Sequence, residues 1–178
     1  PDRNIGTLHS MCYRLLDHPD LATKRKHLEE WNAAHPRWAL KPIDGGGNDV
    51  ERPDDPLGED SDVAERVDVL RHRRTPVEEW TEECRAFHAA WAGFKADKML
   101  LDFTDLIEQV AKHHPYPPGA ISVLIVDEGQ DLSSLETEVI KNWSQVVNVT
   151  VVAGDADQVL YDWRGAHPEL FLPGGVPD

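Results

Sequence analysis

Two apolar stretches, "AISVLIVDEGQD" at residues 120–131 and "NVTVVAGDAD" at residues 148–157, decide the fold of this chain. Each contains a short run rich in β-branched residues, which is typical of a strand buried on both faces of a parallel sheet. Between them, Ser133 and Glu136 have the spacing of a capping box and predict the start of a helix. Strand, helix and strand at this spacing predict a right-handed βαβ unit.

Acidic residues follow both predicted strands. Asp127 and Glu128 come directly after the first strand, and Asp155 comes after the second. In open parallel sheets, ligands bind at the C-terminal ends of the strands. One carboxylate at such a position can hold Mg²⁺, and its neighbour can orient or deprotonate an attacking water. We therefore favour phosphate chemistry over the alternative in which Asp127 only begins a turn.

Length and composition limit the class of protein. The 178 residues, of which 40% are hydrophobic, predict one ordinary domain or one domain that carries an insertion. No apolar run approaches the roughly 20 residues of a membrane span, and the N-terminal residues lack a signal-peptide pattern. Cys12 and Cys84 form no Cys-x-x-Cys pair, which argues against a disulfide framework or a zinc ribbon. We expect a reduced, cytoplasmic setting without a membrane partner.

The charge is strongly acidic and unevenly distributed. A net charge of −15 argues against wholesale binding to a polyanion. Residues 44–66 hold nine acidic residues and two arginines, which predicts a solvated, mobile loop. Basic clusters at residues 24–26 and 71–74 flank this segment, and we interpret each as a solvated helix face. A local groove can still differ in sign from the whole chain, so nucleic-acid binding stays open.

Periodicity divides the chain into three zones. Residues 1–17 contain a helix at about 7–17 with one apolar face. Residues 18–95 form a mainly helical insertion that includes the acidic loop. Residues 96–178 form the α/β zone with both predicted strands. The predicted fold class is therefore α/β, with a parallel sheet and a mainly helical insertion.

A long helix is predicted within the insertion. Thr75 can cap it, Pro76 suits the first helical position, and Glu78 completes a capping box. Large apolar residues then repeat every three or four positions. They are Val77, Trp80, Cys84, Phe87, Trp91 and Phe94. We interpret this stripe as core packing and not as a platform for stacking bases.

Four segments resemble, in order, motifs of superfamily 1 helicases of the UvrD/Rep type. They are "TLHSMCYRLL" at residues 7–16, "LLDFTDLI" at 100–107, "LIVDEGQD" at 124–131 and "VVAGDADQVLYDWRGA" at 151–166. The third segment is similar to motif II, the Walker B segment, and the fourth to motif III. The resemblance implies that the first and third zones belong to subdomain 1A, a RecA-like parallel-sheet core of a P-loop NTPase. It also implies that residues 18–95 are the helical subdomain 1B.

The resemblance implies ATP and Mg²⁺ as ligands. Asp127 would coordinate Mg²⁺, and Glu128 would activate the hydrolytic water. Gln158 would sense the γ-phosphate, and Asp155 would brace the same loop. The resemblance also implies single-stranded DNA at a duplex junction as partner.

Five residues would contact the DNA. Trp163 would stack against a base, with Tyr161 and Arg164 beside it in the groove. Thr7 and His9 would touch the DNA backbone. Since Gln158 lies five residues before Trp163, one short segment would couple ATP hydrolysis to strand movement.

The sequence also departs from the family pattern. Leu8 replaces the usual phenylalanine, and no Gly-x-x-x-x-Gly-Lys-Ser/Thr loop is present. We therefore expect an internal fragment of a longer helicase that hydrolyses ATP at background when isolated. The family typically moves 3′ to 5′, while the pathway, whether repair or replication, and any loading partner stay open.

Three alternatives stay open. A helicase–nuclease of the RecB/AddA kind shares these motifs. A metal-dependent phosphohydrolase would need further histidine or aspartate ligands at strand ends, and His113 and His114 precede the strand instead. A non-catalytic module could use the helical zone to bind a protein partner.

Overall fold

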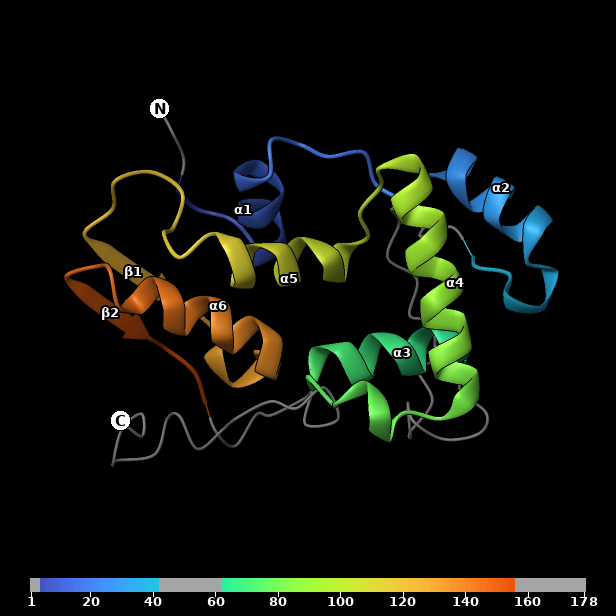
Figure 1. The fold of residues 1–178 in the computed structure, drawn as a ribbon. Helices are drawn as coiled ribbons and strands as arrows, with labels where there is room; N and C mark the ends of the chain where they lie inside the picture. Colours follow the sequence, from blue (N-terminus) through green and yellow to red (C-terminus); the bar gives the residue numbers. More distant parts are fainter. Residues whose placement is uncertain (1–3, 42–61, 156–178) are drawn as a thin grey trace. The chain divides into compact units, whose positions relative to one another are not determined.

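The computed structural model describes residues 4–41 and 62–155 of the chain (Figure 1). These residues divide into two compact units. Within the described ranges, the first unit contains residues 4–18, 72–74 and 104–155, and the second contains residues 19–41, 62–71 and 75–103. The second unit thus consists largely of the region predicted to be an insertion.

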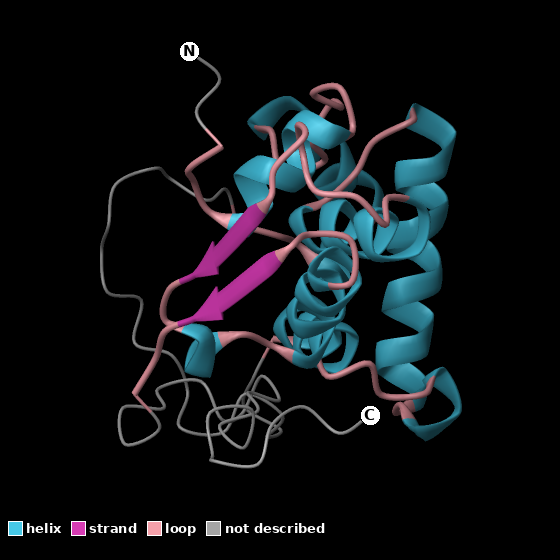
Figure 2. Ribbon diagram, turned by 90° about the vertical axis from the view of Figure 1, so that its left-hand side faces the viewer, coloured by secondary structure: helices cyan, strands magenta, loops and turns pink. Residues whose placement is uncertain are grey.

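The first unit contains two parallel strands joined by a helix. Strand β1 (Val123–Val126) pairs in parallel with strand β2 (Val149–Val152), with Val123 opposite Val149. Figure 2 shows both strands running in the same direction. Helix α6 (Ser134–Ser144) lies between them in the chain. The predicted succession of strand, helix and parallel strand is therefore confirmed.

Helix α6 is fixed at both ends. The Ser133 hydroxyl accepts a hydrogen bond from the backbone N–H of Glu136, and the Glu136 carboxylate accepts one from the backbone N–H of Ser133 at 2.9 Å. This reciprocal pair confirms the predicted capping box. Near the other end, the Trp143 indole N–H donates to the carbonyl of His114 at 3.2 Å, just after helix α5 (Phe103–His113). The helix between the strands is therefore anchored to a neighbouring helix.

Helix α1 (Leu8–Leu15) confirms the predicted N-terminal helix. Thr7 caps it, because the Thr7 hydroxyl accepts a hydrogen bond from the backbone N–H of Ser10 at 3.2 Å. Cys12, on the predicted apolar face, is fully buried. Burial raises the pKa of the Cys12 thiol to about 12, and the carboxylate of Glu136 adds to this effect. The thiol is therefore protonated at neutral pH, and Cys12 behaves as a core residue.

The strands are less buried than the sequence predicts. Leu124 and Val126 are buried on one face of β1, whereas Ile125 on the other face is 70% exposed. Strand β2 also exposes Val149 and Val151. The prediction of strands buried on both faces is therefore wrong for the described part of the chain. A β-branched apolar run reports the preference of the residues for burial, and the elements packed around the sheet decide how much of it is met.

The second unit is helical with an aromatic core. It contains helix α2 (Arg25–Ala34), the 3₁₀ turns η1 (Pro36–Trp38) and η2 (Val77–Glu79), and helix α4 (Glu82–Lys98). Helix α3 (Val63–His72) contributes all but its last residue. Its core cluster includes Leu28, Trp31, Val63, Val67, Trp80, Cys84, Phe87, Trp91 and Leu100. The predicted aromatic stripe is thus confirmed as core packing, although Val77 is exposed.

The predicted start of the long helix is wrong. Helix α4 begins at Glu82, and Thr81 caps it by accepting a hydrogen bond from the backbone N–H of Cys84 at 3.2 Å. Before it, Trp80 is buried in the core and its indole N–H donates to the carbonyl of Thr75 at 2.8 Å. This arrangement requires an extended backbone at Trp80 and interrupts the helix that the capping-box pattern predicts.

The boundaries of the acidic loop and the nature of one basic cluster also differ from the prediction. Helix α3 begins at Val63, within the segment predicted to be a loop. Arg71, in the basic cluster predicted to be solvated, is buried against the carboxylate of Asp102 in the second unit. His72 is buried in the first unit and hydrogen bonds to Ser133 at 2.9 Å. A run of charged residues therefore does not reveal which of them have buried partners.

In the described ranges, no helix combines the length and apolar character needed to cross a lipid bilayer. Cys12 and Cys84 are both free, buried thiols.

Candidate functional site

The ends of the two strands are held together by the chain that follows them. The backbone N–H of Ala153 donates to the carbonyl of Val126 at 2.8 Å, and the N–H of Gly129 donates to the carbonyl of Ala153 at 2.9 Å. A third hydrogen bond runs from the N–H of Asp155 to the side-chain oxygen of Gln130 at 3.1 Å. The acidic residues after β1 therefore lie beside the chain that continues from β2, as predicted from parallel pairing.

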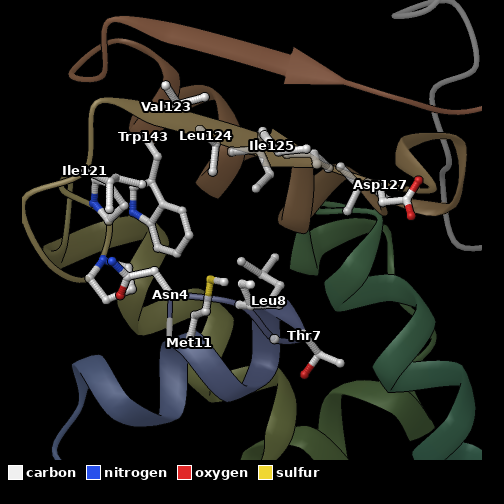
Figure 3. Close-up of a pocket in the computed structure, with 17 residues that line it drawn as sticks. Asn4, Thr7, Leu8, Met11, Ile121, Val123, Leu124, Ile125, Asp127 and Trp143 are labelled. Carbon is white, nitrogen blue, oxygen red and sulfur yellow. The ribbon is translucent and has the colours of Figure 1, made fainter. Parts of the chain in front are cut away.

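Asp127 is the first residue after β1 and is exposed. Its Oδ1 atom accepts a hydrogen bond from the backbone N–H of Glu128 at 3.1 Å, which orients the carboxylate. Figure 3 shows Asp127 at the end of the strand, beyond the apolar side chains of β1. Proteins commonly hold Mg²⁺ through one or two carboxylates, with phosphate oxygens and retained waters as the other ligands. An exposed, oriented carboxylate at a strand end fits this chemistry.

Glu128 has an unusual backbone conformation. Its φ of 52° and ψ of 39° lie in the left-handed region, where a non-glycine residue costs about 1–3 kcal/mol. Gln130 holds its side chain, because the amide Nε2 of Gln130 donates to Glu128 Oε2 at 2.6 Å. The short 3₁₀ turn η3 (Gly129–Asp131) follows directly. The turn therefore fixes both the backbone and the carboxylate of the predicted catalytic base.

Gln130 is the residue of this site to which the sequence pattern assigned no role. Its side chain is 2% exposed, and both ends of its amide are hydrogen-bonded. The available signal was a neutral amide immediately after two carboxylates at the end of an apolar strand. That signal does not identify the partners of the amide, since Asp155 lies 25 residues further along the chain.

A pocket of about 540 Å³ opens between β1 and the start of α1. Figure 3 shows Leu8 and Met11 of α1 facing Leu124 of the strand, with Trp143 beside them. The pocket is therefore mostly apolar. Thr7, predicted to touch DNA, and Asp127, predicted to hold Mg²⁺, both line it. Thr7 is exposed and its hydroxyl serves as the helix cap, while His9 is half-buried.

The remaining predicted site residues follow the end of the described chain. Gln158, Tyr161, Trp163 and Arg164 lie outside the described residues. Asp155 is the last described residue and is exposed. The roles predicted for these side chains, and for Thr7 and His9, therefore stay predictions.

Residues 4–41 and 62–155 contain no group of three or more histidine, cysteine, aspartate or glutamate side chains able to hold a metal ion. A metal centre of the phosphohydrolase kind requires such a group, so these ranges provide none for that alternative. A single Mg²⁺ ligand such as Asp127 makes a smaller demand, because nucleotide phosphates and water supply the other ligands.

Comparison with known proteins identifies helicase relatives. A family model described as the UvrD/REP helicase N-terminal domain matches residues 2–173. The ATP-dependent DNA helicase Rep of Buchnera aphidicola subsp. Schizaphis graminum is 40% identical over 81 residues, covering 41% of this chain and 12% of that protein. The ATP-dependent DNA helicase PcrA of Staphylococcus epidermidis is 25% identical over 188 aligned positions, covering 94% of this chain and 25% of that protein.

A further relative carries a different name. An ATP-dependent helicase/nuclease of Lactiplantibacillus plantarum is 28% identical over 125 residues, covering 63% of this chain and 10% of that protein. The chain thus spans a quarter or less of the length of each of these three relatives.

Proposed function

Since the chain belongs to the UvrD/REP helicase N-terminal domain family, we propose that it is a segment of an ATP-dependent DNA helicase that couples hydrolysis of Mg-ATP to movement on single-stranded DNA. The proposed direction is 3′ to 5′. On this proposal, the first unit is part of a RecA-like core, and the second unit is the helical subdomain inserted into it. The activity is proposed for the full-length protein.

One observation supports this proposal above the others. Asp127 and Glu128 stand at the end of β1, and hydrogen bonds from Gly129 and Gln130 join this turn to the chain that leaves β2. A parallel sheet that presents carboxylates on a turn at its C-terminal edge is suited to phosphate chemistry. The family membership makes ATP the proposed phosphate substrate.

Each proposed role uses a group whose chemistry suits it. Asp127 would hold Mg²⁺, which supplies positive charge to the phosphates when bound. Glu128 would accept a proton from the attacking water, and its fixed carboxylate favours that role. Gln158 would contact the γ-phosphate while Asp155 braces its loop. Localisation in the cytoplasm is part of the same proposal.

The DNA track is proposed from residues on both sides of the sheet sequence. Trp163 would stack on a base, with Tyr161 and Arg164 beside it. Thr7 and His9, near the start of α1, would contact the DNA backbone.

A second candidate is the helicase part of a helicase–nuclease. The likeness to the Lactiplantibacillus helicase/nuclease favours this candidate. Both candidates use the same ATP site. They differ in whether the full-length protein also cuts DNA, so a nuclease assay on the full-length protein separates them.

The proposal is tested by replacing Glu128 with glutamine in the full-length protein. Loss of a general base should lower DNA-stimulated ATP hydrolysis by about 100-fold or more. ATP binding should change little, because glutamine keeps the size of the side chain. Glu29→Gln, on the exposed surface of α2, is the matched control and should hydrolyse ATP at the wild-type rate. Equal rates for the two variants would contradict the proposal. We expect the isolated 178 residues to hydrolyse ATP at background.

A further inference from the structure

The amide of Gln130 connects the two strand ends that form the proposed site. Its Nε2 donates to the Glu128 carboxylate at 2.6 Å, and its Oε1 accepts from the backbone N–H of Asp155 at 3.1 Å. With 2% of the residue exposed, water has little access to this side chain. Gln130 therefore links a proposed catalytic side chain on one strand end to the main chain on the other.

Only one orientation of this amide satisfies both neighbours. A carboxylate accepts hydrogen bonds and a backbone N–H donates them, so one end of the side chain must donate while the other accepts. If the amide were turned over, its oxygen would face the Glu128 carboxylate and its NH₂ group would face the N–H of Asp155. An ionised glutamate of the same length supplies two acceptors, and methionine supplies no strong donor or acceptor.

We infer that Gln130 is a positioning residue: it holds the Glu128 carboxylate for its role as base and couples the position of that carboxylate to the chain that begins at Asp155. This inference rests on the proposed function. The coupling is direct, because a single buried side chain makes both hydrogen bonds. The chain from Asp155 leads to Gln158 and Trp163, for which contacts with nucleotide and DNA are proposed.

The backbone of Glu128 gives Gln130 a reason to matter. A left-handed conformation at a non-glycine residue persists where surrounding contacts hold it. The hydrogen bonds from Gln130 to Glu128 and from Gly129 to Ala153 are such contacts. Without the amide donor, the carboxylate of Glu128 can leave its position while the strands stay paired.

The test uses two variants of the full-length protein. Gln130→Met keeps the approximate volume of the side chain and removes both hydrogen bonds. It should lower kcat for ATP hydrolysis by about 10- to 100-fold, the usual effect of removing a group that orients a site residue, with KM for ATP unchanged. It should also lower the factor by which single-stranded DNA stimulates hydrolysis, because the link to Asp155 is lost.

Gln130→Glu separates the two hydrogen bonds. It keeps an acceptor for the N–H of Asp155 and replaces the donor to Glu128 with a second carboxylate. We expect kcat as low as in Gln130→Met, with the stimulation factor kept at the wild-type value. Gln109→Met is the matched control, since Gln109 is exposed on α5, and it should behave as wild type. A merely structural role would lower both variants in proportion to the unfolded fraction seen by circular dichroism.

The outcomes are distinguishable. Wild-type kcat and stimulation in Gln130→Met would overturn the inference, and so would a loss in both variants that tracks the unfolded fraction. A wild-type protein without DNA-stimulated ATP hydrolysis would instead overturn the proposed function, on which the inference rests. Loss of kcat in both folded variants, with stimulation kept only in Gln130→Glu, would support the inference.

Discussion

Replacing Asp102 by asparagine should strongly destabilise the second unit. Asp102 is 9% exposed, and its carboxylate neutralises two buried cations. Arg71 Nη1 lies 3.0 Å from Oδ2 and 3.2 Å from Oδ1, and Lys95 Nζ lies 2.6 Å from Oδ2. The indole N–H of Trp91 donates to the same Oδ2 atom at 2.9 Å. The substitution removes the negative charge and keeps both cations in the interior.

The expected magnitude follows from this burial. Arg71 is 7% exposed and Lys95 is 5% exposed, so solvent compensates neither cation well. Removing one partner of a buried ion pair usually costs about 3–5 kcal/mol, because the charge left behind is uncompensated. Asparagine retains one oxygen acceptor, so we expect about 3 kcal/mol, the lower end of that range. Since each 1.4 kcal/mol is about a tenfold change, the unfolded population should rise by a factor of about 100 or more.

The assay is urea unfolding of the 178-residue chain, followed by tryptophan fluorescence and far-UV circular dichroism. Asp97→Asn is the matched control, because Asp97 is exposed on the same helix, α4, as Trp91 and Lys95. Equal free energies of unfolding for Asp97→Asn and Asp102→Asn would refute the reasoning.

A triple substitution tests the cause of the loss. Replacing Arg71 and Lys95 by methionine and Asp102 by leucine removes all three charges from the buried cluster. Replacement of a buried ion group by apolar residues of similar volume is often neutral or stabilising. The triple variant should therefore be more stable than Asp102→Asn. If it is not, uncompensated charge does not explain the loss.

Two further predictions concern DNA binding and pH. Trp163→Ala in the full-length protein should weaken binding of a fluorescent single strand by about 1–3 kcal/mol while ATP affinity is kept, and unchanged strand affinity would exclude the stacking role. The guanidinium groups of Arg66 and Arg37 lower the pKa of Glu83 below its ordinary value of 4.5. A lowered folded-state pKa adds stability that is present above the unfolded-state pKa and is lost as the pH falls through the folded-state pKa. The urea midpoint should therefore fall less steeply in Glu83→Gln than in wild type between about pH 5 and pH 3, and parallel profiles would contradict this.

Local patterns in the sequence predicted the elements around the site. The capping box of Ser133 and Glu136 joins residues three positions apart, and the structure contains both of its hydrogen bonds. The apolar runs before Asp127 and Asp155 form the predicted parallel strands. These features depend on hydrogen bonds within one turn and on the spacing of apolar residues, both of which are visible in a short window.

The same kind of pattern failed where a distant contact was stronger. Thr75, Pro76 and Glu78 have the spacing of a helix start, yet α4 begins at Glu82. Burial of the Trp80 ring in the core, together with its hydrogen bond to the carbonyl of Thr75, extends the backbone before the helix. A capping pattern reports a local preference that tertiary packing can override.

The sequence by itself determined the parallel strand–helix–strand unit, the carboxylates at its edge and the apolar faces of the helices. Only the tertiary structure decided which polar side chains meet. Arg71 and Asp102 are 31 residues apart, and Gln130 and Asp155 are 25 residues apart. The spacing of residues along a helix or strand determines which face a side chain occupies. Its partner across the chain depends on how the elements pack, because a buried charge or amide must find its counterpart within hydrogen-bond distance in the folded state.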